Sequence, residues 1–373
     1  TLYAEARMDL RPWDYWTQEG APQPGTLEIL QILEGVLARN PDHPGALHYY
    51  IHIVEASSEP ERAVPAAERL GGLMPGAGHL VHMPSHIYIR VGRYAEAWES
   101  NAKAAAADEA YMAQYQPAVG YPMQGMYPLM YYTHNLHFQW ASACMEGWSA
   151  EALRAARATV ANVPMEVVRQ VPFVEFVVPT PLYALVRFGK WEEILQEPAP
   201  PADLRFSTGM WHYARGLALA ATKRIDEATA ELDSVGAIAA ATPPEQAVAL
   251  NSAAVLLRVA EAVLGGELAA RKGQFDEAVR LLAEGVRLED GLRYDEPPDW
   301  YFPVRQSLGA VLLTAGRAAE AEVVYREDLQ RNPENGWSLY GLRQSLEAQG
   351  RKEEAAAIAA RFDRAWARAD VQL

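Results

Sequence analysis

Apolar residues recur along most of the chain at the spacing of an amphipathic helix. In segments 26–39, 95–108 and 276–288 they fall at positions i, i+3, i+4 and i+7, which places them on one face of a helix with 3.6 residues per turn. Alternation of polar and apolar residues, the pattern of a half-buried strand, is scarce. The pattern therefore predicts a fold that is almost entirely α-helical.

A short turn signal separates these helical segments. It consists of Gly-Arg, Gly-Lys or a close variant, then an aromatic or apolar residue, then a Glu-Ala pair that opens the next helix. Three intervals between successive signals, 58–92, 189–223 and 316–350, are 34 residues long. Each signal is expected to join two helices, and the longer intervals are expected to contain insertions. The clearest signals begin at Gly92, Gly147, Gly189, Lys223, Gly273, Gly316 and Gly350.

The period and the turn signal resemble those of the tetratricopeptide-repeat (TPR) family, whose 34-residue repeats are helix-turn-helix units. The matching residues are Ala321, Tyr325 and Pro333 in a second helix, and Trp337, Tyr340 and Gly341 in the following first helix. The resemblance covers essentially the whole chain and is weak around 110–133, 196–206 and 290–300. It implies an all-α, right-handed α-solenoid of about eight TPR-like units whose first helices line a concave groove.

The chain is expected to consist of two parts with different roles in the solenoid. Residues 1–147 are predicted to form the N-terminal TPR-like repeats, with an insertion at about 110–133, and residues 148–373 to extend and cap the solenoid. The insertion is rich in Tyr and Met. It is interpreted either as a lid over a substrate or as a cap over an irregular step in the solenoid.

Histidine is concentrated in the N-terminal part. Eight of the nine histidines lie between residues 43 and 137, and the repeat register places several at equivalent positions of successive first helices. His48 and His82 are 34 residues apart, as are His52 and His86. Counting back from the turn at Gly147 adds the third repeat. The resulting columns are His48, His82 and His137; His52 and His86; and His79 and His134.

In-register histidines on neighbouring helices predict a metal centre. Residues i and i+3 or i+4 share a helix face, and side chains from stacked helices converge on one ion at bond lengths of about 2.0–2.1 Å. Glu55 shares the face of His52 and is the candidate catalytic residue, as a general base, or else a ligand or an orienting group. The main alternative is a groove that binds a polar or acidic peptide. The expected metal ligands are His48, His52, His79, His82, His86, His134 and His137.

Amino-acid composition restricts the candidate metal ions and the candidate classes of partner. The single cysteine, Cys144, excludes an internal disulfide and thiolate-rich sites, so imidazole ligation favours copper, zinc or iron. A net charge of −15 argues against a nucleic-acid partner, and no apolar run reaches the roughly 18 residues of a membrane span. The chain opens on Thr1 without Met, so we expect it to be trimmed upstream, and its localisation and oligomeric state stay open.

These features lead to one main hypothesis and two alternatives. The main hypothesis is a TPR-fold, metal-dependent enzyme with a histidine-rich centre on the concave face, an oxidoreductase rather than a hydrolase. The first alternative is a non-catalytic TPR scaffold that binds a peptide, a protein or a small molecule in its groove. The second is a metal store or metallochaperone, which would bind metal without turnover.

Overall fold

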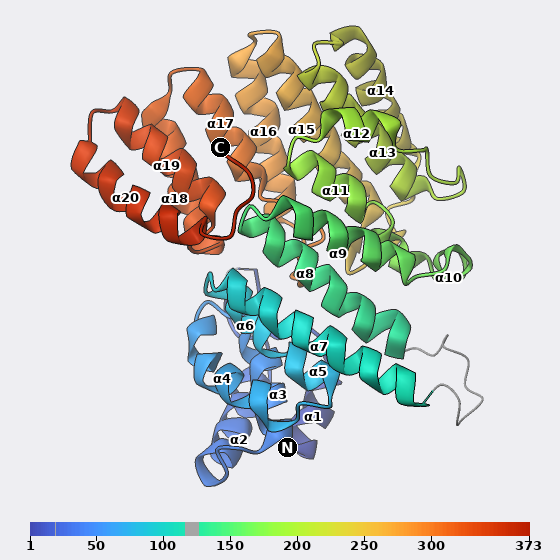
Figure 1. Cartoon of the computed structure of the whole chain (residues 1–373), viewed down its shortest axis with the longest axis vertical. Coiled ribbons are helices and arrows are strands. Elements are labelled where there is room, and N and C mark those ends of the chain that lie inside the picture. Colours follow the sequence, from blue (N-terminus) through green and yellow to red (C-terminus); the bar gives the residue numbers. More distant parts are fainter. Residues whose placement is uncertain (19, 116–126) are drawn as a thin grey trace. The chain divides into compact units, whose positions relative to one another are not determined.

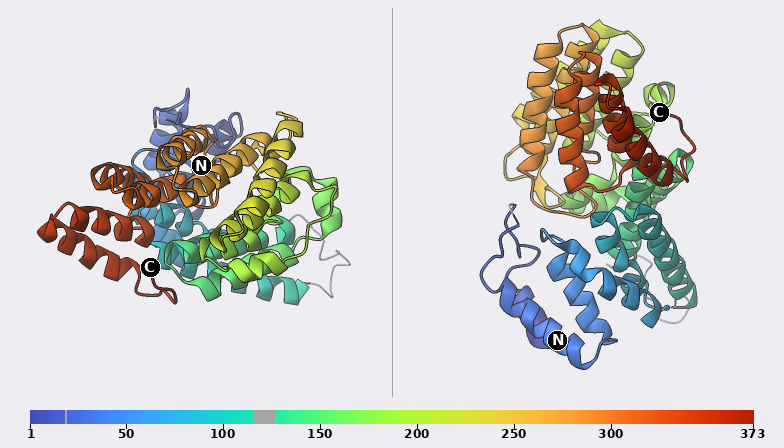
Figure 2. Two further views of the ribbon diagram at one scale, coloured as in Figure 1. Left: turned by 90° about the horizontal axis from the view of Figure 1, so that it is seen from above. Right: turned by 90° about the vertical axis from the view of Figure 1, so that its left-hand side faces the viewer.

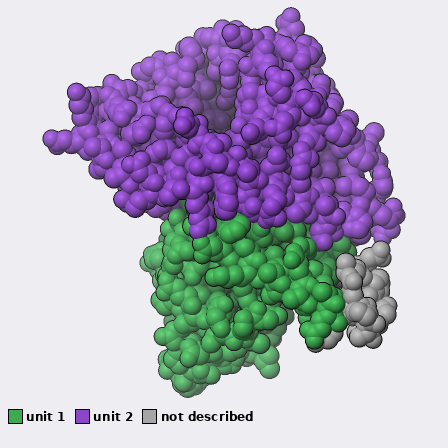
Figure 3. All heavy atoms as spheres, viewed as in Figure 1, with its two compact units in different colours: residues 1–143 green, residues 144–373 purple. Residues whose placement is uncertain are grey.

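A computed structural model describes residues 1–18, 20–115 and 127–373 of the chain. The described residues form two compact units, unit 1 with residues 1–143 and unit 2 with residues 144–373 (Figure 3). The sequence placed the division a few residues later, at 147. Apart from one small hairpin, the secondary structure of both units is helical (Figure 1).

The helices of unit 1 range in length from five to 22 residues. Helix α3 packs on α2 and α4, and α5 and α6 pack on α7. The helices are α1 (Leu2–Met8), α2 (Thr26–Arg39), α3 (Pro44–Val54), α4 (Val64–Leu73), α5 (Gly78–His82), α6 (Pro84–Arg90), α7 (Tyr94–Tyr115) and α8 (Thr133–Met145), with a 3₁₀ turn η1 (Pro60–Ala63) and a π turn η2 (Pro128–Tyr132).

Unit 2 begins within the last turn of α8. From α11 onward each helix packs on the next, and α11, α13, α15, α17 and α19 also pack on one another in succession (Figure 2). Its helices are α9 (Ser149–Ala161), α10 (Met165–Gln170), α11 (Thr180–Arg187), α12 (Trp191–Gln196), α13 (Arg205–Ala221), α14 (Ile225–Ala241), α15 (Ala253–Arg271), α16 (Phe275–Asp290), α17 (Val304–Thr314), α18 (Ala318–Arg331), α19 (Gly336–Ala348) and α20 (Lys352–Ala365). A 3₁₀ turn η3 (Pro172–Val177) and the antiparallel strands β1 (Ala247–Val248) and β2 (Asn251–Ser252) complete it.

The turn signals have a direct physical explanation. Each places a residue with positive φ between two helices, a conformation that glycine adopts without a steric penalty and that ends a helix. The φ angle is 78° at Gly92 and 76° at Gly350, and the non-glycine exception, Lys223, has φ 66°. The arginine of the signal then pairs with the glutamate three residues later in the new helix. The pairs are Arg93–Glu96, Arg224–Glu227, Arg317–Glu320 and Arg351–Glu354.

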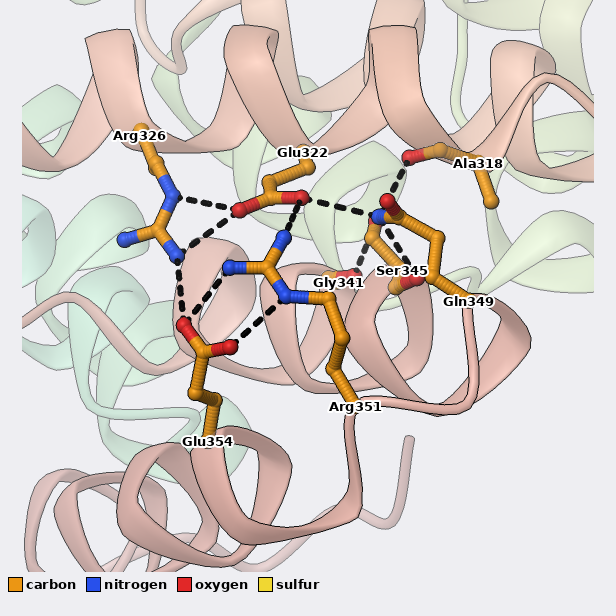
Figure 4. Close-up of polar contacts among 8 residues, drawn as sticks. All are labelled: Ala318, Glu322, Arg326, Gly341, Ser345, Gln349, Arg351 and Glu354. Atoms are coloured by element: carbon orange, nitrogen blue, oxygen red, sulfur yellow. Dashed lines mark hydrogen bonds and ion pairs between the residues drawn. The ribbon is translucent and has the colours of Figure 1, made fainter.

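Arg93, Arg317 and Arg351 also connect neighbouring helix pairs. Arg351 reaches from the α19–α20 turn to Glu322 of α18, with Nη1 2.5 Å from Oε2, while it also holds Glu354 of α20 (Figure 4). The Nε2 amide of Gln349 donates to the same carboxylate of Glu322 at 2.8 Å. This network ties three successive helices together at the polar edge of the stack.

Glycine and tyrosine explain the close approach of helices in unit 2. A Cβ added at Gly309 or at Gly341 would lie 2.5 Å and 2.1 Å, respectively, from the ring of Tyr325. Tyr325 of α18 therefore fits between α17 and α19 only because both positions lack a side chain. The prediction of an all-α fold built of TPR-like helix pairs is confirmed.

Two segments of unit 1 are considered separately. Pro84 divides the first helix of its repeat into α5 and α6, the kink expected of a proline in a helix interior. In the predicted insertion, the lid residues Tyr121, Met123 and Met126 lie outside the described residues.

Among the helices that the structure describes, none is both long and apolar enough to cross a membrane.

Candidate metal centre

Four helices of unit 1 bring the histidines together. His48 and His52 stand one turn apart on α3, His79 and His82 lie on α5, His86 lies on α6 and His134 lies on α8. Helix α3 packs on α6, and α5 packs on α4 and α7 (Figure 1). Among the described residues, three overlapping groups place their ligand atoms within 4.8 Å of one another. The groups are His48, His52 and His79; His82, His86 and His134; and His52, Glu55 and His86.

The first group, called the outer triad, consists of His48, His52 and His79. Nε2 of His48 lies 3.0 Å from Nε2 of His79, and the ring centroids of His48 and His52 are 4.9 Å apart. All three residues are half-buried. The ring of Tyr131, whose residue is 40% exposed, packs against His79 at a centroid distance of 4.7 Å. The outer triad therefore lies near solvent.

The second group, called the inner triad, consists of His82, His86 and His134. Nε2 of His82 lies 2.9 Å from Nε2 of His86, and the ring of His134 lies 4.8 Å from that of His82. His82 is fully buried, His86 is 5% exposed and His134 is half-buried. The ring of Phe138, itself fully buried, packs against each of the three imidazoles with ring centroids 4.9 Å apart. An aromatic side chain thus closes one side of the inner triad.

Glu55 lies between the two triads, at the C-terminal end of α3. Its Oε1 lies 3.3 Å from Nδ1 of His52 in the outer triad, and its Oε2 lies 3.2 Å from Nδ1 of His86 in the inner triad. Arg90 fixes the backbone at this point, since its Nε donates to the carbonyl oxygen of Glu55 at 2.9 Å. One carboxylate therefore faces an imidazole from each triad.

Hydrogen bonds at Nδ1 leave Nε2 to face the neighbouring histidine. The amide Nδ2 of Asn101 donates to the Ala97 carbonyl at 2.7 Å, which directs its Oδ1 to accept from Nδ1 of His82 at 2.7 Å. His82 then carries its proton on Nδ1 and a lone pair on Nε2. Two ligands about 2.1 Å from one tetrahedral ion lie about 3.4 Å apart. The observed Nε2–Nε2 separations of 3.0 and 2.9 Å are close to that value.

Two polar atoms of this cluster lack a hydrogen-bond partner among the described residues. They are Nδ1 of His79 and Oε2 of Glu55; both are buried, and the 3.2 Å approach of His86 Nδ1 to Oε2 is an ion-pair distance without hydrogen-bond geometry. A buried polar atom without a partner costs about 1–3 kcal/mol. The cluster is therefore incomplete as a purely structural hydrogen-bond network.

Burial keeps the imidazoles neutral. Removal from water lowers the pKa of His48, His79, His86 and His137 to about 3 and that of His52 to about 4, and it lowers the pKa of His82 and His134 well below the ordinary value. Neighbouring histidines add to the effect in most cases, because a second positive charge nearby is unfavourable. Neutral imidazole is the form that coordinates a metal.

The carboxyl group of Glu55 responds in the opposite direction. Burial raises its pKa to about 7, against the lowering influence of His86 and of Arg90. A carboxyl group with such a pKa exchanges a proton near neutral pH. Glu55 can therefore act as a hydrogen-bond acceptor for imidazole, as a metal ligand or as a base.

The remaining histidines lie apart from the three ligand groups. His137 is buried on α8 and stacks on Trp140 with ring centroids 4.8 Å apart. His43 caps the N-terminus of α3, where its side chain accepts from the Ala46 amide. His212 of unit 2 pairs with Glu231. Six of the seven predicted ligands thus fall in the ligand groups, and His137 lies outside them.

Sequence reasoning did not identify the residues that support these histidines. Asn101 lies on the second helix of its repeat, and Phe138 lies one turn after His134. Neither belongs to a repeated column, so the register gave no signal for them. The one available signal was Asn101 itself, a polar residue within the apolar face of a helix, which is fully buried in the structure.

Comparison with known proteins adds little to this picture. No family model matches the sequence, and no curated protein matches it. The chain is similar to yeast Tom70 in its crystal structure at 11% identity and a TM-score of 0.28, over 99% of this chain and 93% of that chain. It is similar to a chain in the structure of Naa15/Naa10 bound to HypK-THB at 10% identity and a TM-score of 0.23, over 97% and 72% of the two chains. Similarity at this level supports no inference, and the fold assignment rests on the helix pairs and their turns.

Proposed function

We propose that unit 1 binds transition-metal ions through its histidines and that the bound metal is the centre of an oxidoreductase. The observation that supports metal binding most directly is that six histidines and Glu55 form three ligand groups. Within each group, the ligand atoms lie within 4.8 Å of one another. Geometry and protonation agree, because burial holds these imidazoles in the neutral form that binds metal. A cluster that served packing alone would be more stable with apolar side chains, since each buried imidazole brings two nitrogens that require partners.

The chemistry of the ligands restricts the choice of metal ion. Imidazole suits zinc, copper and iron, while the described groups contain no thiolate. Three protein ligands leave a coordination position for water or substrate, as in catalytic sites. We favour redox chemistry over hydrolysis because Glu55 faces two imidazoles, His52 and His86, and so serves first to orient them.

Metal analysis tests the first part of the proposal. The full chain, purified without a polyhistidine tag, is expected to contain or take up stoichiometric copper, zinc or iron when measured by inductively coupled plasma mass spectrometry. The double variant His48→Gln/His82→Gln, with one change in each triad, is expected to lose it. His212→Gln is the matched control, because it makes the same substitution in unit 2. Absence of metal from the wild-type chain after reconstitution would refute metal binding.

Oxygen consumption tests the second part. Copper- or iron-loaded protein is expected to consume oxygen in the presence of ascorbate or a catechol, and the double variant is expected not to. Metal binding without turnover on any reductant would leave the store or metallochaperone alternative and remove the enzyme.

A second candidate function concerns unit 2. A pocket of about 470 Å³ is lined by residues of α11, α13, α15, α17 and α19. The guanidinium of Arg187 lies 3.9 Å from the ring centroid of Trp337 and 5.3 Å from that of Phe302. A cation between aromatic rings favours a peptide or small molecule that carries a carboxylate beside an apolar group.

Tryptophan fluorescence tests this candidate, because Trp337 and Trp191 line the pocket. Screening short peptides and aromatic carboxylates is expected to yield saturable quenching that Arg187→Met weakens at least tenfold. Equal binding to wild type and Arg187→Met would refute a role for the pocket.

A further inference from the structure

We infer that the histidine cluster forms two metal sites that differ in access: an outer site of His48, His52 and His79, which exchanges its ion, and an inner site of His82, His86 and His134, which retains it. This inference rests on the metal-binding function proposed above and adds the number of ions and the order in which they are lost.

The number follows from the ligand count and the grouping of the rings. Six imidazoles exceed the four ligands of a tetrahedral ion. Within each triad, one pair of Nε2 atoms lies at 3.0 Å or less. Between the triads, His52 and His86 instead turn their Nδ1 atoms toward Glu55. A ring engaged through Nδ1 presents Nε2 on its other side, so the two rings direct their free nitrogens away from Glu55 into separate groups.

This arrangement excludes a single central ion that has Glu55 as a ligand. The third group, His52, Glu55 and His86, would use one histidine of each triad for a single central ion. That ion would leave the close Nε2 pairs of both triads without a metal. The two-site arrangement uses all six histidines and keeps Glu55 as a shared carboxylate, which stabilises positive charge in both sites and positions one ligand of each.

The difference in access follows from burial. The three outer residues are half-buried, and Tyr131, beside His79, is 40% exposed. In the inner triad, His82 and His86 are buried and only His134 is half-buried, and the fully buried ring of Phe138 contacts all three imidazoles. An ion can reach water from the outer site by displacing partly exposed side chains. From the inner site it must displace the half-buried His134, which packs on the buried ring of Phe138, or wait for the outer site to empty and open a path between His52 and His86, whose rings are 5.3 Å apart.

Zinc release measures both the number of sites and their access. The metal-free full chain is loaded with Zn²⁺, freed of excess by gel filtration and mixed with the chromophoric chelator 4-(2-pyridylazo)resorcinol at pH 7.5. Two equivalents are expected, one released at least tenfold faster than the other. The rate of the slow phase is expected to be independent of chelator concentration, because opening of the protein limits it.

Single substitutions assign the phases. His48→Gln is expected to remove the fast equivalent and to leave the slow one. His134→Gln is expected to remove the slow equivalent and to leave the fast one. His137→Gln is the matched control, since it changes a buried histidine of the same helix that lies outside both triads, and it is expected to leave both phases. Circular dichroism of each metal-free variant verifies that it folds, and the two-phase release of the wild type decides the inference if His134→Gln does not fold.

The outcomes separate this inference from the function on which it rests. No bound zinc in the wild type would overturn both. A single equivalent, or two equivalents released at one rate, would overturn the two-site inference and leave metal binding intact. Loss of all zinc in both His48→Gln and His134→Gln would show one shared centre, which also overturns it.

Discussion

Units 1 and 2 each bury a cluster of polar aromatic side chains at the same level of the repeat, and the two clusters differ in how the polar atoms that face one another are paired. His82 stands ten residues before the turn at Gly92, and Tyr213 stands ten residues before the turn at Lys223. In unit 2, the hydroxyls of Tyr213 and Tyr301 hydrogen-bond to each other at 3.0 Å. In unit 1, His82 belongs to a set of histidines beside which, among the described residues, Nδ1 of His79 has no hydrogen-bond partner and Oε2 of Glu55 has only its ion-pair contact with Nδ1 of His86.

The comparison contrasts a structural cluster in unit 2 with the proposed metal-binding cluster in unit 1. Buried hydroxyls that pair with each other need nothing further, and Tyr183 stacks on Tyr301 with ring centroids 4.3 Å apart, so the rings also fill the core. Clustered imidazoles have less to gain from one another, since two neutral rings share only one proton between facing nitrogens. The repeat supplies the same position in both units, and the side chain placed there decides between packing and ligation.

Metal removal is expected to produce the largest difference between the units. Zinc at a free concentration one thousand times its dissociation constant stabilises the state that binds it by about 4 kcal/mol. Hydrogen–deuterium exchange followed by mass spectrometry is therefore expected to show faster exchange in α3, α5, α6 and α8 after chelation, with α13, α15 and α17 of unit 2 unchanged. Equal changes in both units, or none in unit 1, would contradict the assignment of the metal to unit 1.

Acid is expected to produce the second-largest difference, because it destabilises unit 1 of the metal-free protein. The pKa of His48, for example, is about 3 in the folded state against 6.5 ordinarily, so the unfolded state binds more protons as pH falls below 6.5. Each such histidine contributes a slope of up to about 1.4 kcal/mol per pH unit. Glu55 acts in the opposite sense, because its folded pKa of about 7 exceeds 4.5, but it binds one proton against those of several histidines.

The contribution of these histidines to stability should accordingly be constant above about pH 7 and fall between pH 6.5 and 4. Thermal unfolding monitored by circular dichroism checks this, with His48→Gln/His82→Gln as the variant in which the slope becomes shallower. A midpoint that is constant over this range would contradict the burial of neutral imidazoles.

Two glycines provide a steric comparison of intermediate size. A Cβ at Gly78, the first residue of α5, would lie 1.9 Å from Oδ1 of Asp108, a buried carboxylate that accepts hydrogen bonds from Tyr127 and Asn135. A Cβ at Gly341 of unit 2 would lie 2.1 Å from the ring of Tyr325. Alanine at either position is expected to cost about 1–3 kcal/mol of unfolding free energy, because neither neighbour can move freely.

Their effects on metal binding should differ. Gly78→Ala displaces the helix that carries His79 and His82, so it is expected to weaken zinc binding at least tenfold, while Gly341→Ala leaves it unchanged. Competition titration against a zinc indicator measures this. Weakening by both variants to the same extent would mean that the loss reflects general instability rather than the position of α5.

The sequence was sufficient for the fold and for most of the cluster, and the limits have physical causes. The 34-residue period predicted that His52 and His86 would meet, and their rings are 5.3 Å apart. It also placed His48 beside His82, whereas His48 makes its close contact with His79. Pro84 ends the helix between His82 and His86, so equivalent positions are not at equal heights.

The contrast between His134 and His137 illustrates a second limit. The register assigned both to columns, but residues i and i+3 point in directions about 60° apart around a helix. Only His134 faces the inner triad, and His137 stacks on Trp140. Periodicity identifies a helix face but not which of two residues on it reaches a given point. That choice depends on the packing angle of α8, which no sequence motif specifies.

The smallest expected effect is the most direct test of the comparison between the clusters. Tyr213→Phe leaves the hydroxyl of Tyr301 without its partner and is expected to cost about 1 kcal/mol, whereas Tyr213→Phe/Tyr301→Phe removes both partners and is expected to be nearly neutral. The corresponding double change in unit 1, His48→Leu/His79→Leu, removes a facing pair together with the unpartnered Nδ1 of His79. It is expected to raise the unfolding free energy of the metal-free protein by up to about 1 kcal/mol.

Urea denaturation with and without zinc measures both doubles. Zinc is expected to stabilise Tyr213→Phe/Tyr301→Phe as much as the wild type and to stabilise His48→Leu/His79→Leu less. If the histidine pair were structural, as the tyrosine pair is, its replacement would change stability equally in the presence and absence of zinc. A stability gain that appears only without metal is the signature of side chains retained for a ligand, because the polar atoms that weaken the empty fold are those that the ligand engages.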